Sequence, residues 1–536
     1  MSELMKGATI LTLGLFLSKF LGLVYIFPFY AIVGEENVGL YQYAYIPYNI
    51  MLSIAISGFP LAVSKFVSKY NALGDYEAGH RLMKSGVWAM ILSGFASFII
   101  LNLLATPIAH SVIEDDEQIY SVAQIAEVIR WVSFALIVVP FMSLFRGFFQ
   151  GYGQYMPTSS SQLVEQIARI IVLLGGAFLV IVVFKGEPAT AINFAVFAAF
   201  IGALAGIGVL YFYWKKFRGD LNEKLAISVS SGHLSYSKIY KEVITYSIPF
   251  VIVGLAGSLF QLVDMLTFNK TMNSIGLAKV TDIYFMMLNF STHKVVMIPV
   301  MLATGLSMAL VPTITKYYTL GEFDLLRGAL DKTYQILLFI TLPAVVGISI
   351  LASEIYHVLY EQSEMGAMVL AHYAPVAILF ALFTVSAALL QGINYQKWVV
   401  FSLLTGLLVK LVLNISLIKL LEVDGAILAT ALGYLTTIVI NIVVIHKTLN
   451  YRSIMVKRRI FLIVILTAVM AIAVASVDAV LNMIAPAQGK LMAFLYSTVC
   501  IAVGVGIYGY LSLRLGLAQK LLGARVVKIA NKLGFK

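Results

Sequence analysis

Four basic side chains lie near the middle of long apolar stretches of this sequence: Lys19, Arg169, Lys294 and Lys410. A charge at the centre of a bilayer costs several kcal/mol, so it usually faces a partner, a water-filled cavity or a ligand. Ammonium and guanidinium groups bind phosphate and carboxylate groups through charge-assisted hydrogen bonds. Basic residues at this depth therefore favour an anion-binding cavity, whereas a carrier of cationic drugs needs acidic and aromatic side chains.

Neighbouring acidic and polar residues suggest partners for two of these cations. Glu165 and Arg169 are four residues apart on one expected helix, a spacing that predicts a local ion pair. Lys410 could pair with Asp264, and Asn414 lies one turn beyond Lys410 on the same helical face. For the cluster around Lys410, a structural role and a coupling role both remain open.

Lys19 and Lys294 have no acidic residue nearby on their own expected helices. This favours a substrate-binding role for both, with snorkelling or a partner on another helix as the alternative. His293 stands beside Lys294 and could add a hydrogen-bond donor, although a lone histidine is more often a satisfied polar residue.

Transmembrane helices must position these residues. The chain has 536 residues, of which 60% are apolar and 12% charged, too few charges to cover the soluble domains of so long a chain. The apolar residues run all round each stretch, which argues against barrel strands. Fourteen stretches are long enough to cross a bilayer: about 7–33, 39–64, 86–109, 122–148, 158–184, 189–214, 242–268, 282–311, 333–352, 366–391, 398–420, 424–446, 460–481 and 491–513.

The distribution of basic residues gives these spans a direction. With the N-terminus inside, 27 of the 37 Lys and Arg residues fall on cytoplasmic segments and 5 in outer loops. We therefore expect a multi-pass membrane protein with both termini in the cytoplasm. The net charge of +11 marks topology and does not indicate nucleic acid binding. The basic tail 515–536 suits an interfacial helix on anionic lipids, or else is simply solvated.

An internal repeat indicates two related halves. Residues 69–76 resemble residues 316–323 at an offset of 247, and Gln150-Gly151 with Arg169 resembles Gln391-Gly392 with Lys410 at an offset of 241. Six spans in each half predict parallel repeats and favour alternating access. The expected domains are a six-helix lobe 1–220, a cytoplasmic linker 221–241, a six-helix lobe 242–450, helices 13 and 14 in 451–514, and the tail 515–536.

Some residues within the spans could permit bending. Pro60, two residues after Gly58, and Pro299 interrupt helical hydrogen bonding and are the best hinge candidates, although a static kink is an alternative for each. Arg146, at the inner end of a span, is a further gating candidate.

The sequence lacks the common motifs for ATP hydrolysis and for hydrolytic catalysis. It contains no GxxxxGK[ST], HExxH or GxSxG motif, and its single cysteine, Cys500, cannot form an intrachain disulfide. We expect a transporter and not an enzyme, without cofactor or metal, that draws energy from an ion gradient or the membrane potential.

Several local strings resemble a known family. They are Ser18-Lys19-Phe20-Leu21-Gly22, Gly58-Phe59-Pro60-Leu61-Ala62-Val63-Ser64-Lys65, Arg146-Gly147-Phe148-Phe149-Gln150-Gly151, and Lys410 with Asn414. With the fourteen-span pattern, they resemble the polysaccharide-transport branch of the multidrug/oligosaccharidyl-lipid/polysaccharide (MOP) exporter superfamily. They look most like its Gram-positive group, which includes stage V sporulation protein B and the MurJ-type lipid II flippases.

This resemblance implies a V-shaped all-α bundle that moves undecaprenyl-diphosphate-linked peptidoglycan precursor (lipid II) to the outer leaflet. In that family, cationic residues of spans 1, 2 and 8 line a central cavity. Lys19, preceded by Ser18, matches the first position, Tyr25 replaces a second cation, and Lys294 or His293 falls near the span 8 position.

The resemblance also bears on the other spans. Spans 13 and 14 are expected to shelter the polyprenyl tail, and cell-wall synthesis proteins are possible partners. Some relatives bind sodium between spans 7, 11 and 12, where Lys410 and Asn414 lie in this sequence, so an ammonium could replace the metal.

Three other functions remain open. One is a flippase for another lipid-linked glycan, such as a teichoic acid, capsule or exopolysaccharide unit. A second is a cation-coupled multidrug exporter, and a third is a scaffold for cell-wall assembly that transports nothing.

Overall fold

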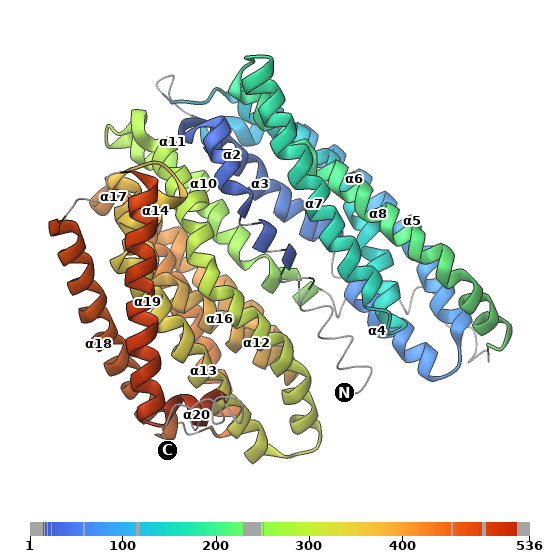
Figure 1. Cartoon of the computed structure of the whole chain (residues 1–536). Helices are drawn as coiled ribbons and strands as arrows, with labels where there is room; N and C mark the ends of the chain where they lie inside the picture. Colours follow the sequence, from blue (N-terminus) through green and yellow to red (C-terminus); the bar gives the residue numbers. More distant parts are fainter. Residues whose placement is uncertain are drawn as a thin grey trace. The chain divides into compact units, whose positions relative to one another are not determined.

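The computed structural model describes residues 14, 17, 18, 20–22, 24–56, 59–113, 118–228, 248, 249, 251–451, 454–484 and 489–522. Across these residues the secondary structure is helical, with no strand, which confirms the predicted all-α class. The chain divides into two compact units, residues 1–283 and 284–536 (Figure 1).

The helices fall into the two units as follows. The first unit contains α2 (Ile26–Val33), α3 (Glu35–Ile56), α4 (Phe59–Ala72), α5 (Tyr76–Val112), α6 (Val122–Gly151), α7 (Met156–Phe178), the π-helix η1 (Leu179–Val183), α8 (Pro188–Ala226), α10 (Ala256–Ser274) and most of α11 (Ala278–Met286). The second contains the π-helix η2 (Met287–Thr292), α12 (His293–Thr319), α13 (Phe323–Ile350), α14 (Ala352–Leu359), α15 (Glu364–Tyr373), α16 (Val376–Gly392), α17 (Gln396–Leu449), α18 (Ile454–Ile484), α19 (Lys490–Arg514) and α20 (Leu517–Leu522).

Ten helical segments of the described chain are long and apolar enough to cross a membrane. One of them, α17, holds the two predicted spans 398–420 and 424–446. Its direction reverses at Glu422, which has a φ of 52°. The reversal brings Gly425 against the carbonyl of Leu417, so the two arms of α17 form a helical hairpin. The predicted spans 7–33, 39–64 and 242–268 match none of the ten, so the total of fourteen and the V shape stay predictions.

In the first unit, α5, α6, α7 and α8 run side by side (Figure 1). Helix α6 also packs against α4, and two glycines one turn apart permit this close approach. A Cβ on Gly147 would meet the carbonyl of Pro60, and one on Gly151 would lie 2.7 Å from the Cβ of Val67. These contacts give a physical reason for both glycines in the string 146–151.

The second unit repeats this packing at the offsets seen in the sequence. A Cβ on Gly392 would lie 3.3 Å from Ile314, just as Gly151 faces Val67 in the first unit. The turns after these helices also match: Gly74 and Gly321 have φ values of 75° and 73°, and Gly153 and Asn394 have 73° and 63°. The two halves therefore share backbone geometry as well as sequence.

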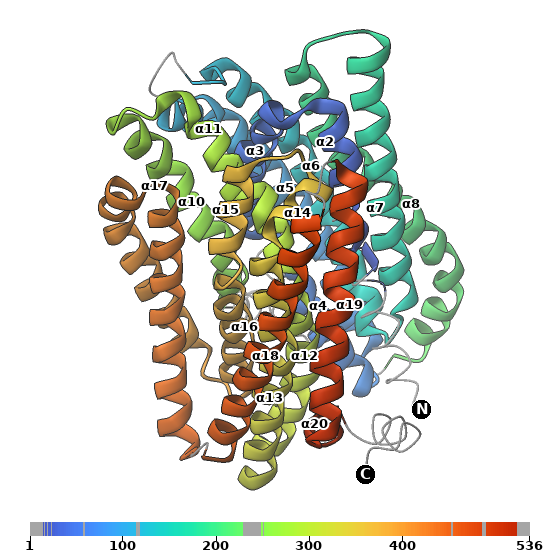
Figure 2. The ribbon, with the colours of Figure 1, turned by 60° about the vertical axis from the view of Figure 1, so that its left-hand side comes forward.

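Helices α18 and α19 are part of the second unit (Figure 2), where α18 packs against α13 and α19 against α14. The Tyr508 hydroxyl on α19 donates to the Phe339 carbonyl on α13 at 2.9 Å. An apolar core surrounds this bond and includes Leu351, Ile463, Leu466, Met470, Cys500 and Leu521.

The predicted domain boundaries remain predictions. Helix α10, expected in the lobe 242–450, packs against α3 and α5 of the first unit. Helix α8 continues to Ala226, inside the predicted linker, and α20 covers the start of the predicted tail. Residues 229–241 and 523–536, the remainder of the linker and tail, lie outside the described residues.

Candidate functional site

Two of the predicted site residues, Lys19 and Gly58, lie outside the described residues. Ser18 is helical and partly exposed, and Tyr25 is buried immediately before α2. Pro60 lies in α4. The predicted span 39–64 overlaps both α3 and α4. Pro299 is buried within α12. The hinge roles of both prolines stay predictions.

A tyrosine cluster surrounds Arg169 in the first unit. The Nη2 of Arg169 donates to the Tyr41 hydroxyl at 3.1 Å and to the Tyr45 hydroxyl. The guanidinium carbon lies 5.1 Å from the centroid of the Tyr45 ring, and the Tyr41 hydroxyl lies 3.2 Å from that of Tyr25. Arg169 is thus held by neutral groups, and no carboxylate of the described chain forms an ion pair with it.

The predicted ion pair between Glu165 and Arg169 is wrong. The Glu165 carboxylate instead accepts from Nη2 of Arg146 on α6 at 2.7 Å. Arg146 also donates to the Ser161 hydroxyl, from Nη2 at 2.7 Å and from Nε at 3.2 Å. Helix α7 therefore presents Glu165 to α6 and Arg169 to the tyrosines of α3. Four-residue spacing made the pair with Arg169 possible, but packing of α6 on α7 supplied a closer cation.

In the second unit, His293 and Lys294 follow directly after the π-helix η2. The hydroxyl of Thr292 donates to the Met287 carbonyl five residues earlier at 2.7 Å. The Tyr360 hydroxyl donates to the Ser291 carbonyl at 2.9 Å. Burial raises the pKa of Tyr360, so this hydroxyl keeps its proton. Single π-helical turns are frequent at functional sites because they rotate the side chains that follow.

An aromatic group orients the His293 ring. Its Nδ1 lies 3.0 Å from the Tyr373 hydroxyl on α15, and the ring makes an edge contact with Phe380 on α16. The ammonium of the partly exposed Lys294 lies 5.6 Å from the centroid of the Phe290 ring. His293 and Lys294 thus have different surroundings.

Lys410 lies between the two arms of α17 and is fully buried. Its ammonium donates to the Thr430 hydroxyl at 2.6 Å across the hairpin. Asn414, one turn away on the same arm, is also fully buried. Asp264 is buried on α10 in the first unit, whereas Lys410 belongs to the second, so their pairing stays a prediction. Among the described residues, no group of three acidic, His or Cys side chains could hold a metal ion.

Sequence reasoning missed a polar cluster around Asp282 in the first unit. This carboxylate is 1% exposed and accepts from the Tyr43 hydroxyl at 2.8 Å and the Ile119 amide at 2.9 Å. The Asn269 amide donates to the Tyr43 hydroxyl at 2.7 Å and lies 3.4 Å from Asp282. The Gln118 amide is 3.5 Å away. One carboxylate therefore ties α3, α10 and the loop between α5 and α6 to α11.

No local signal marks Asp282 in the sequence. It stands at the edge of a predicted span, where an acidic residue is expected to face the membrane surface. Its partners lie 13 to 239 residues away along the chain. The charge rule places residues 113–121 outside, so the Asp282 cluster is expected on the outer side.

Comparisons with known proteins identify the family of the chain. The model of the polysaccharide biosynthesis protein family matches residues 4–318. The lipid II flippase MurJ of Bacillus subtilis is 45% identical over 531 residues, 98% of each chain. Stage V sporulation protein B of the same organism is 24% identical over 453 residues, 83% of this chain and 84% of that protein.

Solved structures show the same fold. Lipid II flippase MurJ in an inward closed conformation matches with a TM-score of 0.66 and 14% identity, over 95% of this chain and 99% of that one. An inward-facing multidrug resistance transporter of the MATE family, in the MOP superfamily, gives 0.64 and 15%, over 83% and 95%. The chain therefore belongs to the polysaccharide biosynthesis protein family and is a multi-pass membrane protein with the MOP transporter fold.

Proposed function

We propose that this protein is a flippase that moves lipid II from the inner to the outer leaflet of the bacterial cytoplasmic membrane by alternating access. The observation that carries this proposal is the 45% identity with the lipid II flippase MurJ of Bacillus subtilis over 98% of both chains. The step involves no covalent chemistry. Both termini lie in the cytoplasm in this proposal, and the basic tail 515–536 rests on anionic lipid.

Each unit supplies cationic groups of the kind that a diphosphate needs. In the first unit, Arg169 is held by tyrosine hydroxyls and not by a carboxylate, so its charge is available to a phosphate. Lys19 adds a second cation on the first span. In the second unit, Lys294 supplies an ammonium, with His293 beside it. These side chains replace part of the hydration of the diphosphate during transport, while the polyprenyl tail stays in lipid, sheltered by α18 and α19.

The membrane potential is the proposed energy source. Moving one elementary charge across it is worth about 2.3 kcal/mol per 100 mV. An inside-negative potential drives an anionic headgroup outward, so a diphosphate with two charges gains roughly twice that value. The ammonium of Lys410 takes the place of a metal ion between the arms of α17, so sodium coupling is not part of the proposal.

Complementation of a flippase-depleted strain tests the function, with outer-leaflet lipid II measured directly. We expect the wild-type chain to restore growth and lipid II exposure. We expect loss of both with Lys19→Ala/Lys294→Ala, and separately with Arg169→Gln. The control is Lys185→Ala/Lys279→Ala, which removes two exposed cations expected in outer loops and leaves transport intact.

Three results would contradict parts of the proposal. Failure of the wild-type chain, present in the membrane at normal amounts, would exclude lipid II. Rescue of a strain defective in another lipid-linked glycan would then favour that substrate. Equal rescue by Lys19→Ala/Lys294→Ala and the wild type would exclude the assigned cations while leaving the substrate in place.

A further inference from the structure

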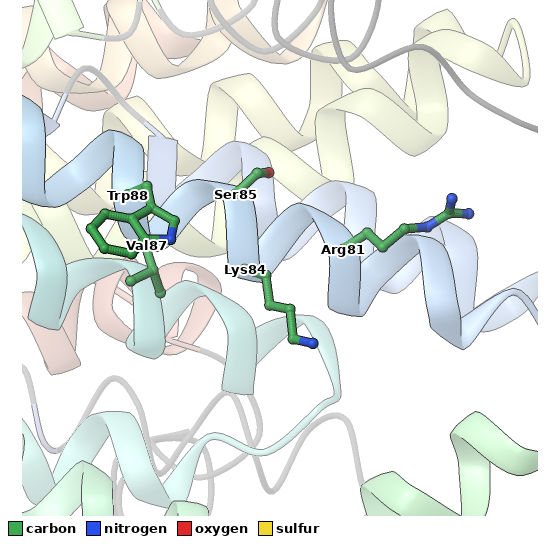
Figure 3. A pocket seen from close by; sticks show the side chains of 5 residues that line it. All are labelled: Arg81, Lys84, Ser85, Val87 and Trp88. Carbon is green, nitrogen blue, oxygen red and sulfur yellow. The ribbon is translucent and has the colours of Figure 1, made fainter.

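A shallow pocket lies on the surface of α5 in the first unit. Its volume is about 430 Å³, and its lining comes from one helix: Arg81, Lys84, Ser85, Val87 and Trp88. Figure 3 shows the two cationic side chains extending from α5, with the indole of Trp88 farther along the same helix. The pocket combines two cations with an aromatic ring that is 75% exposed.

The length of α5 places this pocket at the level of lipid headgroups. Its 37 residues extend about 55 Å, well beyond the roughly 30 Å of a hydrocarbon core. The predominantly apolar part begins at Val87, so Lys84 and Arg81 lie about 4.5 and 9 Å outside it along the axis. That is the depth of the phosphate layer, and Trp88 lies where interfacial tryptophans are enriched. The distribution of basic residues makes this the cytoplasmic side.

An exposed apolar stripe continues from the pocket into the membrane. It consists of Trp88, Leu92, Phe95, Ile99 and Leu103 at intervals of three or four residues, and each side chain is at least 41% exposed. Helical spacing puts Arg81, Lys84 and Ser85 on the same face as this stripe. The surface thus offers cations at headgroup depth and an apolar track for an acyl chain directly below.

The pocket keeps a net positive charge when the nearby Glu77 is included. Glu77, one turn toward the cytoplasm, lies 3.8 Å from Arg81, but its side chain is 56% exposed. Exposed pairs at this distance hold each other weakly. Lys84 forms no ion pair within the described chain, so an anion gains from both side chains.

We propose that this pocket binds an anionic phospholipid of the inner leaflet, such as phosphatidylglycerol. The phosphate lies between Arg81 and Lys84, the Ser85 hydroxyl faces the glycerol region, and an acyl chain follows the stripe from Trp88 to Leu103. A zwitterionic lipid fits less well because its cationic headgroup would approach the same two cations. The site is independent of the proposed transport function.

Tryptophan fluorescence of the full chain in vesicles tests this site. Phe replaces the three tryptophans other than Trp88, and the vesicles contain phosphatidylcholine with about one-fifth phosphatidylglycerol. Two samples are compared, one with brominated acyl chains on phosphatidylglycerol and one with them on phosphatidylcholine. Bromine quenches the fluorescence of Trp88 only when the brominated lipid is adjacent to it. We expect the association constant at this site to be about 5- to 30-fold higher for phosphatidylglycerol than for phosphatidylcholine, the range for one to two surface cations.

Matched charge removal separates this site from general surface charge. Arg81→Gln/Lys84→Gln is expected to bring the preference close to one. Lys215→Gln/Lys216→Gln, which removes two exposed cations from the cytoplasmic end of α8, leaves the preference unchanged. Equal quenching by both brominated lipids in the parent chain would overturn the proposal, as would equal loss of preference in the two double variants.

A second measurement avoids the tryptophan replacements. The unaltered chain is irradiated in vesicles with phosphatidylglycerol that carries a photoreactive acyl chain, and mass spectrometry locates the adducts. We expect adducts along Trp88–Leu103 that fall at least fivefold in Arg81→Gln/Lys84→Gln. Labelling spread evenly over the lipid-facing helices would contradict the site.

Discussion

Glu165 is expected to be energetically coupled to Arg146 more strongly than to Arg169. The Nη2 atom of Arg146 lies 2.7 Å from the Oε2 atom of Glu165. The two side chains are only 12% and 22% exposed, respectively. Replacing Glu165 by Gln is therefore expected to destabilise the protein while Arg146 is present, and to have a smaller effect in an Arg146→Gln background.

The size of this coupling follows from the geometry. Neutral hydrogen bonds in a helical membrane protein contribute about 0.6 kcal/mol on average and about 1.7 at most in double-mutant cycles. Charge-assisted bonds are roughly twice as strong. We expect a coupling energy of about 1–2 kcal/mol between Arg146 and Glu165. Glu165 and Arg169 should show no more than the roughly 0.5 kcal/mol of an ordinary helical pair at this spacing.

Titration of the purified protein from mild detergent into SDS measures these free energies of unfolding. Trp214 is a suitable reporter, because its ring lies 5.7 Å from Phe145 and 5.8 Å from Phe148, on either side of Arg146 in sequence. The two cycles share the Glu165→Gln variant and differ only in the arginine replaced. A coupling to Arg169 as large as that to Arg146 would refute the assignment made from the structure.

Two further predictions concern packing and the buried carboxylate. Gly147→Ala drives a Cβ into the α4 backbone and should cost about 1–3 kcal/mol of unfolding free energy, whereas Gly175→Ala, with open space around it, should cost nothing; equal effects would contradict the close approach. Tyr43→Phe removes a hydrogen bond to Asp282 worth about 1.5–3 kcal/mol, so the Ile119 amide should exchange hydrogen faster, and unchanged exchange would count against the cluster.

Much of the fold could be predicted from the sequence because bilayer physics acts on local composition. Long apolar stretches must be helical in lipid, since each backbone polar group needs a partner within its own helix. The repeat was also visible, because Gly151 and Gly392 occupy equivalent close approaches and a larger residue at either would collide with its neighbour. The hairpin within α17 follows the same logic, with a break at Glu422 between two predicted spans.

The partners of the intramembrane charges were harder to predict. Spacing along a helix identifies possible ion-pair partners on that helix only. For Glu165 it identified Arg169, whereas the partner in the structure is Arg146. The position of Arg146 at the inner end of a span predicts a gating role. In the structure it joins α6 to α7. Its gating role stays a prediction that the transport assay can test.

Local composition and the internal repeat were enough to predict a helical membrane protein with two related halves. Those properties depend on the sum of many residues, so no single contact has to be known. Tertiary structure alone decided that Arg169 is held by tyrosines, that Lys410 bonds across its own hairpin, and that Asp282 ties three segments to α11. Such choices depend on distances of a few ångströms between helices far apart in sequence, because hydrogen bonds and ion pairs act only at short range.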